Sequence, residues 1–398
     1  IIAGCAGGTY ENVAVAADML DGHMVGSGEF DLSVYPSSQP VMAGLIRDGS
    51  FEKLVKTGTI MRTAFCGPCF GAGDTPANNG LSIRHATRNF PNREGSKPGQ
   101  GQIASVALMD ARSIAATVLN GGLVTAASED TCREREHSYA FDSSSYTSRV
   151  YNGYNKPDPT APLVYGPNIV DWPEMSPLTD DILLKICSFI EDPVTTTDEL
   201  IPSGETSTFR SNPLGMAEFT LSRKDPEYVK KAKAVKALDQ ERVGGGSPAE
   251  NNADLRRVFD AIRNNPEYTT INPAEIEYGS TIYAIKPGDG SAREQAASCQ
   301  RVLSGCANIA REYATKRYRS NLINWGMIPF ILEEAPSFRN DQHLFVPGIK
   351  QAIANGESSI TAYIVENDMK PVTLGIGPLS DSEKQIILDG CLINYYRG

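Results

Sequence analysis

Short apolar runs alternate with segments of helical periodicity along residues 1–130. The apolar runs predict strands, and segments with apolar side chains at every third or fourth position predict helices. Alternation of this kind favours a parallel sheet covered by helices on both faces. The predicted strands are Ile1–Ala3, Asp31–Tyr35, Thr59–Ala64, Ser82–His85 and Leu123–Ala126, and the predicted helices are Tyr10–Leu20, Gln39–Arg47, Phe51–Lys56 and Asp110–Leu119.

The periodic pattern stops between residues 131 and 177, where the chain is polar and rich in proline. We interpret residues 131–177 as a linker between two domains. Two domains are also expected from the length of 398 residues, because one hydrophobic core rarely stays intact at this size. The predicted domains are therefore residues 1–130 and residues 178–398.

Periodic segments return in residues 178–398 and predict a second α/β domain. The last predicted helix follows three residues that are typical cap signals, Ser380, Asp381 and Ser382. The predicted strands are Thr281–Ile285, Ser359–Val365 and Pro371–Ile376, and the predicted helices are Pro226–Arg242, Pro248–Asn264, Ala292–Leu303, Ile309–Asn324 and Glu383–Leu388.

The composition is that of an ordinary globular protein, with 40% hydrophobic and 21% charged residues. Its apolar stretches, such as Ile328–Leu332, are too short to cross a bilayer. The amino end of this sequence does not resemble a signal peptide, because no basic region precedes its apolar residues. We therefore expect no membrane association and a cytoplasmic location, with the mitochondrial matrix as an alternative. The net charge of −11 disfavours DNA as a partner, because phosphate binding needs clustered Lys and Arg.

Eight cysteines are dispersed along the chain, which favours reduced thiols over a disulfide framework. Cys66 and Cys69 form a C-x-x-C pair, which is compatible with a dithiol redox site, half of a zinc site, two cluster ligands or two unrelated thiols. Gly71, Gly73 and Pro76 follow and disfavour the helix that a thioredoxin-like redox motif needs. A zinc site lacks further ligands of suitable spacing.

An iron–sulfur cluster needs a third thiolate, and Cys5 stands at the end of the first predicted strand. The predicted strand Thr59–Ala64 leads in the same way into Cys66. The carboxyl ends of parallel strands open onto the same edge of a sheet. Cys5, Cys66 and Cys69 can therefore approach one another despite their separation in the sequence.

A glycine-rich turn, Gly-Asp-Gly-Ser at 288–291, precedes a predicted helix in the second domain. The free backbone N–H groups at a helix start can bind an anion above Ser291. The alternative interpretation is a plain strand–helix connection that is capped by Ser291.

Three separated motifs in the first domain resemble one family. They are Gly-Cys-Ala-Gly-Gly at 4–8, Cys-Gly-Pro-Cys followed by Gly-Ala-Gly-Asp-Thr-Pro at 66–76, and Thr-Arg-Asn-Phe-Pro-Asn-Arg at 87–93. Together they resemble the third domain of the aconitase and isopropylmalate dehydratase superfamily, over most of residues 1–127. The resemblance implies a three-layer α/β/α domain with a parallel sheet.

The same resemblance implies a set of site residues in the first domain. Cys5, Cys66 and Cys69 would hold a [4Fe–4S] cluster that leaves one iron open to the substrate. Arg88 and Arg93 match positions that clamp substrate carboxylates, for which a planar guanidinium is suited.

In the second domain, residues 288–297 are similar to the G-x-G-S-S-R-E-H-A segment of the family's swivelling fourth domain. The resemblance implies an α/β swivel domain in which Ser291 is the catalytic base and Arg293 stabilises its anion. Residues 197–204 are similar to the family's T-D-H-I-S-x-x-G segment, which adds Asp198. Arg210 lies at a position that matches a substrate-binding arginine of the same family.

Several positions depart from the family pattern while the thiols, the serine and the arginines are kept. These changes favour a divergent enzyme whose substrate is not citrate. The departures are Ala6, Gly7, Gly8, Thr87, Glu199, Ile201, Ala292 and Gln295.

The resemblance as a whole implies a lyase that adds water to, or removes it from, a small hydroxy di- or tricarboxylic acid. The alternative is a non-catalytic or cluster-free aconitase-like protein with an RNA-binding or regulatory role. The chain starts with Ile-Ile-Ala-Gly-Cys rather than Met, within a predicted strand. We therefore expect the amino-terminal aconitase domains to be supplied by the same polypeptide or by a separate chain, and the present chain to be inactive alone.

Overall fold

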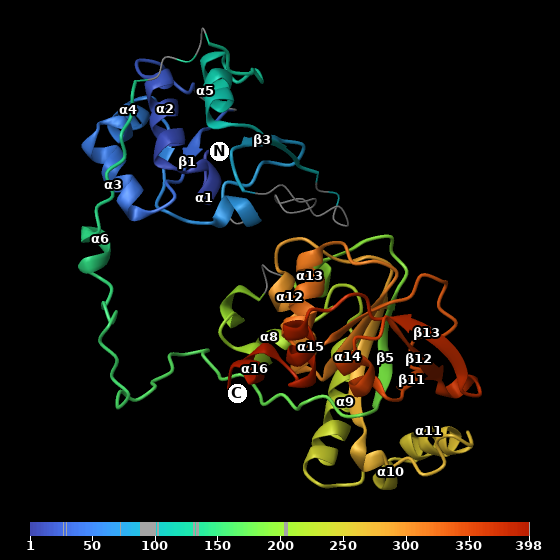
Figure 1. Cartoon of the computed structure of the whole chain (residues 1–398). Coiled ribbons are helices and arrows are strands. Elements are labelled where there is room, and N and C mark those ends of the chain that lie inside the picture. Colours follow the sequence, from blue (N-terminus) through green and yellow to red (C-terminus); the bar gives the residue numbers. More distant parts are fainter. Residues whose placement is uncertain are drawn as a thin grey trace. The chain divides into compact units, whose positions relative to one another are not determined.

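The chain divides into two compact units, Ile1–Pro162 and Leu163–Gly398 (Figure 1). The division lies inside the segment predicted to be the linker, and each unit has its own hydrophobic core. This computed structural model describes residues 1–26, 28, 30–71, 73–87, 101, 103–129, 132, 135–202 and 206–397.

Short parallel strands form the centre of the first unit. Strand β1 (Ser33–Val34) pairs with β2 (Ile60–Met61), and β3 (Leu81–Arg84) pairs with β4 (Ser105–Leu108), in both cases in parallel. Ile2 forms parallel bridges to Val34 on one side and to His85 on the other. The order β2–β1–Ile2–β3–β4 therefore has the parallel direction that the sequence predicted.

The helices of the first unit pack on these strands through small and branched side chains. Helix α2 (Tyr10–Leu20) contacts both α4 (Ser50–Lys56) and α5 (Ala111–Leu119), and α3 (Gln39–Arg47) contacts α2 and α4. The predicted bounds of α2 and α3 are confirmed. The predicted strand Leu123–Ala126 is absent, because Thr125 bonds to the Thr117 hydroxyl instead of to a strand.

Part of the predicted linker packs on the first unit. The Arg135 and His137 side chains bond to Asp18 of α2, and the Tyr139 ring lies 5.1 Å from the Tyr10 ring, measured between centroids. A short helix, α6 (Ser144–Thr147), follows.

A closed barrel of strands in the order β10-β13-β12-β11-β5-β7-β9 forms the second unit. Neighbours along β5–β7–β9–β10 run parallel, and the remaining pairs are antiparallel. The strands are β5 (Ile182–Ile190), β7 (Glu277–Ala284), β9 (Gly305–Ala310), β10 (Ile328–Ile331), β11 (His343–Val346), β12 (Ser359–Ile364) and β13 (Lys370–Gly375).

Helices pack against this barrel (Figure 1). A small separate pair of parallel strands, β6 and β8, follows β5 and β7 along the chain. Adjacent residues of β5 belong to different core clusters, Leu183 to one and Leu184 to the other, so both faces of this strand are covered. The additional elements are β6 (Thr195–Thr196), β8 (Pro287–Asp289), α7 (Thr197–Leu200), α8 (Pro213–Ala217), α9 (Tyr228–Val243), α10 (Pro248–Asn251), α11 (Ala253–Arg263), α12 (Arg293–Val302), α13 (Lys316–Asn324), α14 (Ile349–Asn355), α15 (Asp381–Leu388) and α16 (Leu392–Arg397).

The predicted helix Ile309–Asn324 is wrong in its first part. Ile309 lies in β9, fully buried between β7 and β10. The chain then turns, and α13 starts only after Thr315, whose side chain accepts a hydrogen bond from the Tyr318 N–H. Strand pairing on both sides of Ile309 therefore decides its conformation against the helical pattern of the local sequence.

Candidate functional site

The cysteine motifs of the first unit follow the carboxyl ends of two parallel strand segments that lie on either side of β1. Cys5 lies in a short turn of helix, α1 (Gly4–Gly7), which follows the bridge at Ile2. The chain after β2 reaches Cys66, which precedes the 3-10 helix η1 (Gly67–Phe70) that contains Cys69. Because the strands are parallel, these turns lie at the same edge of the sheet.

Close contacts join these turns. The Cys5 Sγ lies 3.3 Å from the Oγ1 of Thr87, a residue that comes after β3 in the chain. Gly4 has a φ of +74°, and a Cβ at this position would lie 2.8 Å from the Cys69 Sγ. The Cys69 sulfur therefore lies directly over the backbone that precedes Cys5, and a side chain at Gly4 would displace it. The structure brings the turns of Cys5 and Cys69 together.

A buried arginine holds the Cys-Gly-Pro-Cys turn in place. Arg84 of β3 has no exposed surface, and its Nη1 donates a hydrogen bond of 2.6 Å to the Pro68 carbonyl oxygen. Its Nη2 donates to the Ser82 Oγ at 2.8 Å. Sequence analysis missed this role, although a charged residue inside a predicted buried strand is a signal that its partner must also be buried.

The segment after the cysteine turn is fixed by Asp74. Burial raises the pKa of Asp74, but hydrogen bonds from Tyr35, Ser33 and Arg62 outweigh this effect and hold the pKa below its ordinary value. The Arg62 guanidinium lies 2.9 Å from the Asp74 carboxylate. An ionised Asp74 therefore connects this segment to residues that follow β1 and β2.

The thiols suit an iron–sulfur cluster in their chemistry, because all three cysteines are reduced, with Cys5 and Cys66 exposed and Cys69 buried. Within the described ranges, no group of three or more His, Cys, Asp or Glu side chains is close enough to hold a metal ion. The structure thus shows adjacent turns rather than a closed ligand set. The predicted carboxylate clamps, Arg88 and Arg93, lie outside the described residues.

The motifs of the second unit also lie at the carboxyl ends of adjacent parallel strands. Strand β5 leads to Asp198 in α7, and β7 leads to Ser291. Gly290 has a φ of +134°, and a Cβ there would lie 2.1 Å from the Thr197 Oγ1. The loop before Ser291 therefore packs tightly on the start of α7, next to Asp198.

Ser291 lies in the connection that precedes α12. This helix begins at Arg293, and its N-cap residue, Ala292, makes no capping hydrogen bond with its side chain. Ser291 is therefore not the N-cap of this helix, although it does lie in a strand–helix connection between β8 and α12, as the plain interpretation expected. Both Ser291 and Arg293 are half-buried at the positive end of the helix.

Asp198 and Arg210 have different surroundings. The Arg223 Nη1 lies 2.9 Å from the Asp198 carboxylate, so Asp198 is part of an ion pair. Its neighbour Glu199 forms a capping box with Thr196, which starts α7. Arg210 is exposed, and it forms no ion pair with any residue in the described part of the chain.

Trp325 and Trp172, to which the sequence analysis assigned no role, connect the start of α12 and the Arg210 loop to the first residues of the second unit. The Trp325 Nε1 donates a 3.1 Å hydrogen bond to Glu294, in the first turn of α12, and burial raises the pKa of Glu294. The Trp325 ring lies 4.4 Å from the Trp172 ring, and the Val170 N–H bonds to the carbonyl oxygen of Ser211, next to Arg210. The segment around Trp172 therefore touches both loops.

Comparisons with known proteins agree on the first unit. Residues 1–116 match the model of the aconitase family (aconitate hydratase). A 3-isopropylmalate dehydratase large subunit 1 of Methanopyrus kandleri is 33% identical over 114 residues, which are 28% of this chain and 27% of that protein. A probable methanogen homoaconitase large subunit of Methanosarcina mazei is 33% identical over 111 residues, with the same coverage of 28% and 27%.

A solved structure of 3-isopropylmalate dehydratase (LeuD) from Methanocaldococcus jannaschii is 18% identical and covers 55% of this chain and 93% of its own, with a TM-score of 0.33. No described helix has the length and apolar character needed to span a membrane. The chain spans about a quarter of the length of the curated relatives it matches, 27% in the case of the Methanopyrus kandleri protein. Over residues 1–116, the chain is similar to the aconitase family and to 3-isopropylmalate dehydratase large subunits.

Proposed function

We propose that the chain is part of an aconitase-type hydro-lyase that acts on a small hydroxy di- or tricarboxylic acid. The observation that carries the proposal is the packing of the Cys69 sulfur on Gly4, 65 positions earlier in the chain, which joins two motifs that both match the family. The dehydratase and homoaconitase names of the relatives support the reaction class.

Cys5, Cys66 and Cys69 are the proposed ligands of a [4Fe–4S] cluster. A bound cluster would supply a Lewis-acidic iron that polarises the hydroxyl group of the substrate. The protein's contribution is to keep the turns adjacent, through Arg84 under the cysteine turn and through the close approach at Gly4. Exposure of Cys5 and Cys66 leaves this edge open to a ligand.

Ser291 is the proposed base that takes the proton from the carbon next to the hydroxyl group. A serine hydroxyl is too weak an acid for this role unless its anion is stabilised. The positive end of α12 and the Arg293 guanidinium supply such stabilisation, and the contact of Gly290 with Thr197 fixes the loop. Asp198 is proposed to assist in this proton transfer.

Arg88, Arg93 and Arg210 are the proposed partners of the substrate carboxylates, because a guanidinium can bind two oxygens of one carboxylate. Arg210 is suited to this role, since it is exposed and forms no ion pair within the described residues.

We further propose that the first unit is the three-layer α/β/α domain of the family and the second unit its swivelling domain. The remaining aconitase domains would come from the same polypeptide or from a separate chain. Because those domains contribute further substrate and acid groups in the family, we expect no turnover from the present chain alone. The reaction class can be tested through the cluster instead.

Anaerobic reconstitution of the chain with iron and sulfide tests the proposed ligands. We expect a brown protein with an EPR signal after reduction, and we expect Cys66→Ser to lose most of the signal and the bound iron. Cys132→Ser is the matched control, because Cys132 is another reduced cysteine of the first unit but lies in no family motif. Equal iron and sulfide content in both variants would refute the cluster assignment.

A further inference from the structure

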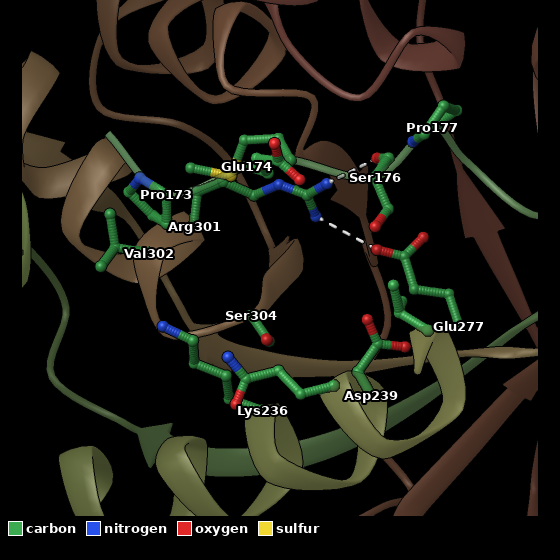
Figure 2. Close-up of a pocket in the computed structure, with 13 residues that line it drawn as sticks. Pro173, Glu174, Ser176, Pro177, Lys236, Asp239, Glu277, Arg301, Val302 and Ser304 are labelled. Atoms are coloured by element: carbon green, nitrogen blue, oxygen red, sulfur yellow. Dashed lines mark hydrogen bonds and ion pairs between the residues drawn. The ribbon is translucent and has the colours of Figure 1, made fainter. Parts of the chain in front are cut away.

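A pocket with a volume of about 440 Å³ in the second unit is lined by charges that already have partners in the protein (Figure 2). The Arg301 Nη1 lies 3.3 Å from the Glu277 carboxylate, and its Nη2 donates to the Ser176 carbonyl oxygen at 3.2 Å. We therefore assign no ligand to this pocket. The first unit differs, because His85 has one bonded ring nitrogen and one without a hydrogen-bond partner among the described residues.

A single hydrogen bond decides which nitrogen of the His85 ring carries the proton. The backbone N–H of Ala111, the first residue of α5, donates to the His85 Nδ1 at 3.1 Å. A nitrogen that accepts this bond carries no proton, so the proton of the neutral ring is on Nε2. Burial lowers the pKa of His85, and the smaller opposite effect of Asp110 does not cancel this, so the ring is neutral at pH 7. The half-buried His85 ring therefore presents a neutral N–H donor.

The ring lies at the edge of the sheet that also carries the cysteine turns. His85 comes directly after β3, and Ala111 comes three residues after the end of β4. Because β3 and β4 are parallel, their carboxyl ends open onto the same edge. Ile2, which forms a bridge to His85, leads into the turn of Cys5 at this edge.

The short helix α1 brings His85 close to the cysteines. A Cβ at Gly4 would lie 2.8 Å from the Cys69 Sγ, and a Cβ at Gly7 would lie 3.1 Å from the His85 Cβ. Three residues separate these two positions, which is about 4.5 Å along a helix axis. Cys5 lies between the two glycines. One turn of backbone is therefore in contact with the Cys69 sulfur at one end and with His85 at the other.

We propose that the His85 Nε2–H donates a hydrogen bond to a sulfur atom of the iron–sulfur cluster for which Cys5, Cys66 and Cys69 are the proposed ligands. This inference rests on the proposed function and adds a residue outside the motifs that resemble the family, since the nearest of them starts at Thr87. An N–H donor beside a cluster sulfur stabilises the negative charge that the cluster gains on reduction. His85 therefore raises the reduction potential of the bound cluster.

Two substitutions separate this role from a structural one. In His85→Asn the side-chain oxygen takes the place of Nδ1 and can accept from the Ala111 N–H, but no donor reaches the position of Nε2. In His85→Gln the side-chain nitrogen takes the place of Nε2, whereas the acceptor for Ala111 is lost. A purely structural His85 would tolerate Asn better than Gln. The proposed role predicts the opposite order for the reduction potential.

An EPR-monitored redox titration of the whole chain, reconstituted anaerobically with iron and sulfide, measures this potential. We expect His85→Asn to lower the equilibrium constant for reduction about tenfold, which is about 59 mV for a one-electron couple. His85→Gln should stay near the parent value. His23→Asn is the matched control, because His23 is an exposed histidine of the same unit that follows α2 instead of a strand. A parent-like potential in His85→Asn, or an equal drop in both His85 variants, overturns the proposal.

NMR spectroscopy of the cluster-free chain tests the donor itself. Long-range 1H–15N correlation reports the protonation of each imidazole nitrogen, and the chain has only four histidines, so the signal that His85→Asn removes identifies His85. We expect a proton on Nε2 and none on Nδ1 at pH 7. A proton on Nδ1 overturns the inference and leaves the proposed lyase function intact. A chain that takes up no cluster would instead refute both.

Discussion

One carboxylate ties the segment after α5 to the first unit. Asp18 of α2 is 3% exposed, and the Lys53 Nζ lies 2.8 Å from its carboxylate. The Arg135 backbone N–H donates to Asp18 at 3.0 Å, and the His137 Nε2 lies 2.7 Å from it. Replacing Asp18 with Asn keeps the shape of the side chain but removes the charge that these groups share.

The pKa of Asp18 gives the size of the effect. Burial raises the pKa of Asp18, but hydrogen bonds from Lys53, the Arg135 backbone and His137 together lower it by more than burial raises it. The net effect is a pKa of about 2 instead of the ordinary value of 3.8. Each unit of pKa difference between the folded and unfolded states corresponds to about 1.4 kcal/mol. We therefore expect Asp18→Asn to lower the free energy of unfolding of the first unit by about 2 kcal/mol at pH 7.

The dependence on pH has a defined sign. Because folding lowers the pKa of Asp18, the stabilisation is fully present above the unfolded value of 3.8 and is lost as the pH falls through about 2. The parent chain and Asp18→Asn should therefore differ by a constant amount from pH 7 down to about 5, and the difference should shrink below pH 4.

Urea unfolding followed by far-UV circular dichroism measures this difference, and a loss of 2 kcal/mol should lower the midpoint by about 1 M. Both tryptophans of the chain, Trp172 and Trp325, lie in the second unit, so their fluorescence provides an internal reference that should not change. Asp21→Asn is the control, because Asp21 also pairs with Lys53 but is 54% exposed. Equal midpoints for both variants, or a difference that persists at pH 2, would refute the reasoning.

Two further predictions concern the loops of the second unit. Gly290→Ala would place a Cβ 2.1 Å from the Thr197 Oγ1, and we expect thermal or urea unfolding to show that the free energy of unfolding falls by at least about 2 kcal/mol. Gly245→Ala is the control, because Gly245 has a φ of +83° but no atom within 4 Å of the new Cβ, so only backbone strain of about 1 kcal/mol is expected. Equal losses would show that the contact with Thr197 does not matter. Trp172→Ala should expose the Trp325 ring, which is 9% exposed, and shift its fluorescence emission to longer wavelength; an unchanged spectrum would contradict the ring contact.

Local sequence determined the elements that carry their own start signals. Helices α2 and α3 begin after Thr9 and Ser38, whose side chains accept hydrogen bonds from backbone N–H groups of the first turn, and their bounds match the predicted ones. Helix α15 begins at Asp381, two residues before the predicted start, and Ser380 is the one of the three cap signals that caps it. Such caps act within a few residues, so they are visible without the fold.

The sequence analysis did not predict strand β5, because no local signal marks this strand. Nearly all of Ile182–Ile190 is buried, because one face packs inside the barrel and the other against the helices. A strand that is covered on both faces has no alternating pattern and resembles a buried helix segment in sequence. Its partners β7 and β11 are far away in the chain, so only the completed barrel defines it.

For the candidate site too, some features were visible in the sequence and others only in the tertiary structure. The motifs around Cys5 and Cys66 are continuous in sequence, and they indicated the likeness to the aconitase family that residues 1–116 show. The chemical roles of Cys5, Cys66 and Ser291 stay predictions. Only the tertiary structure showed that Arg84 supports the cysteine turn and that Gly290 packs against Thr197. These contacts join residues that are distant along the chain, and the energy of such contacts depends on positions that a local pattern does not contain.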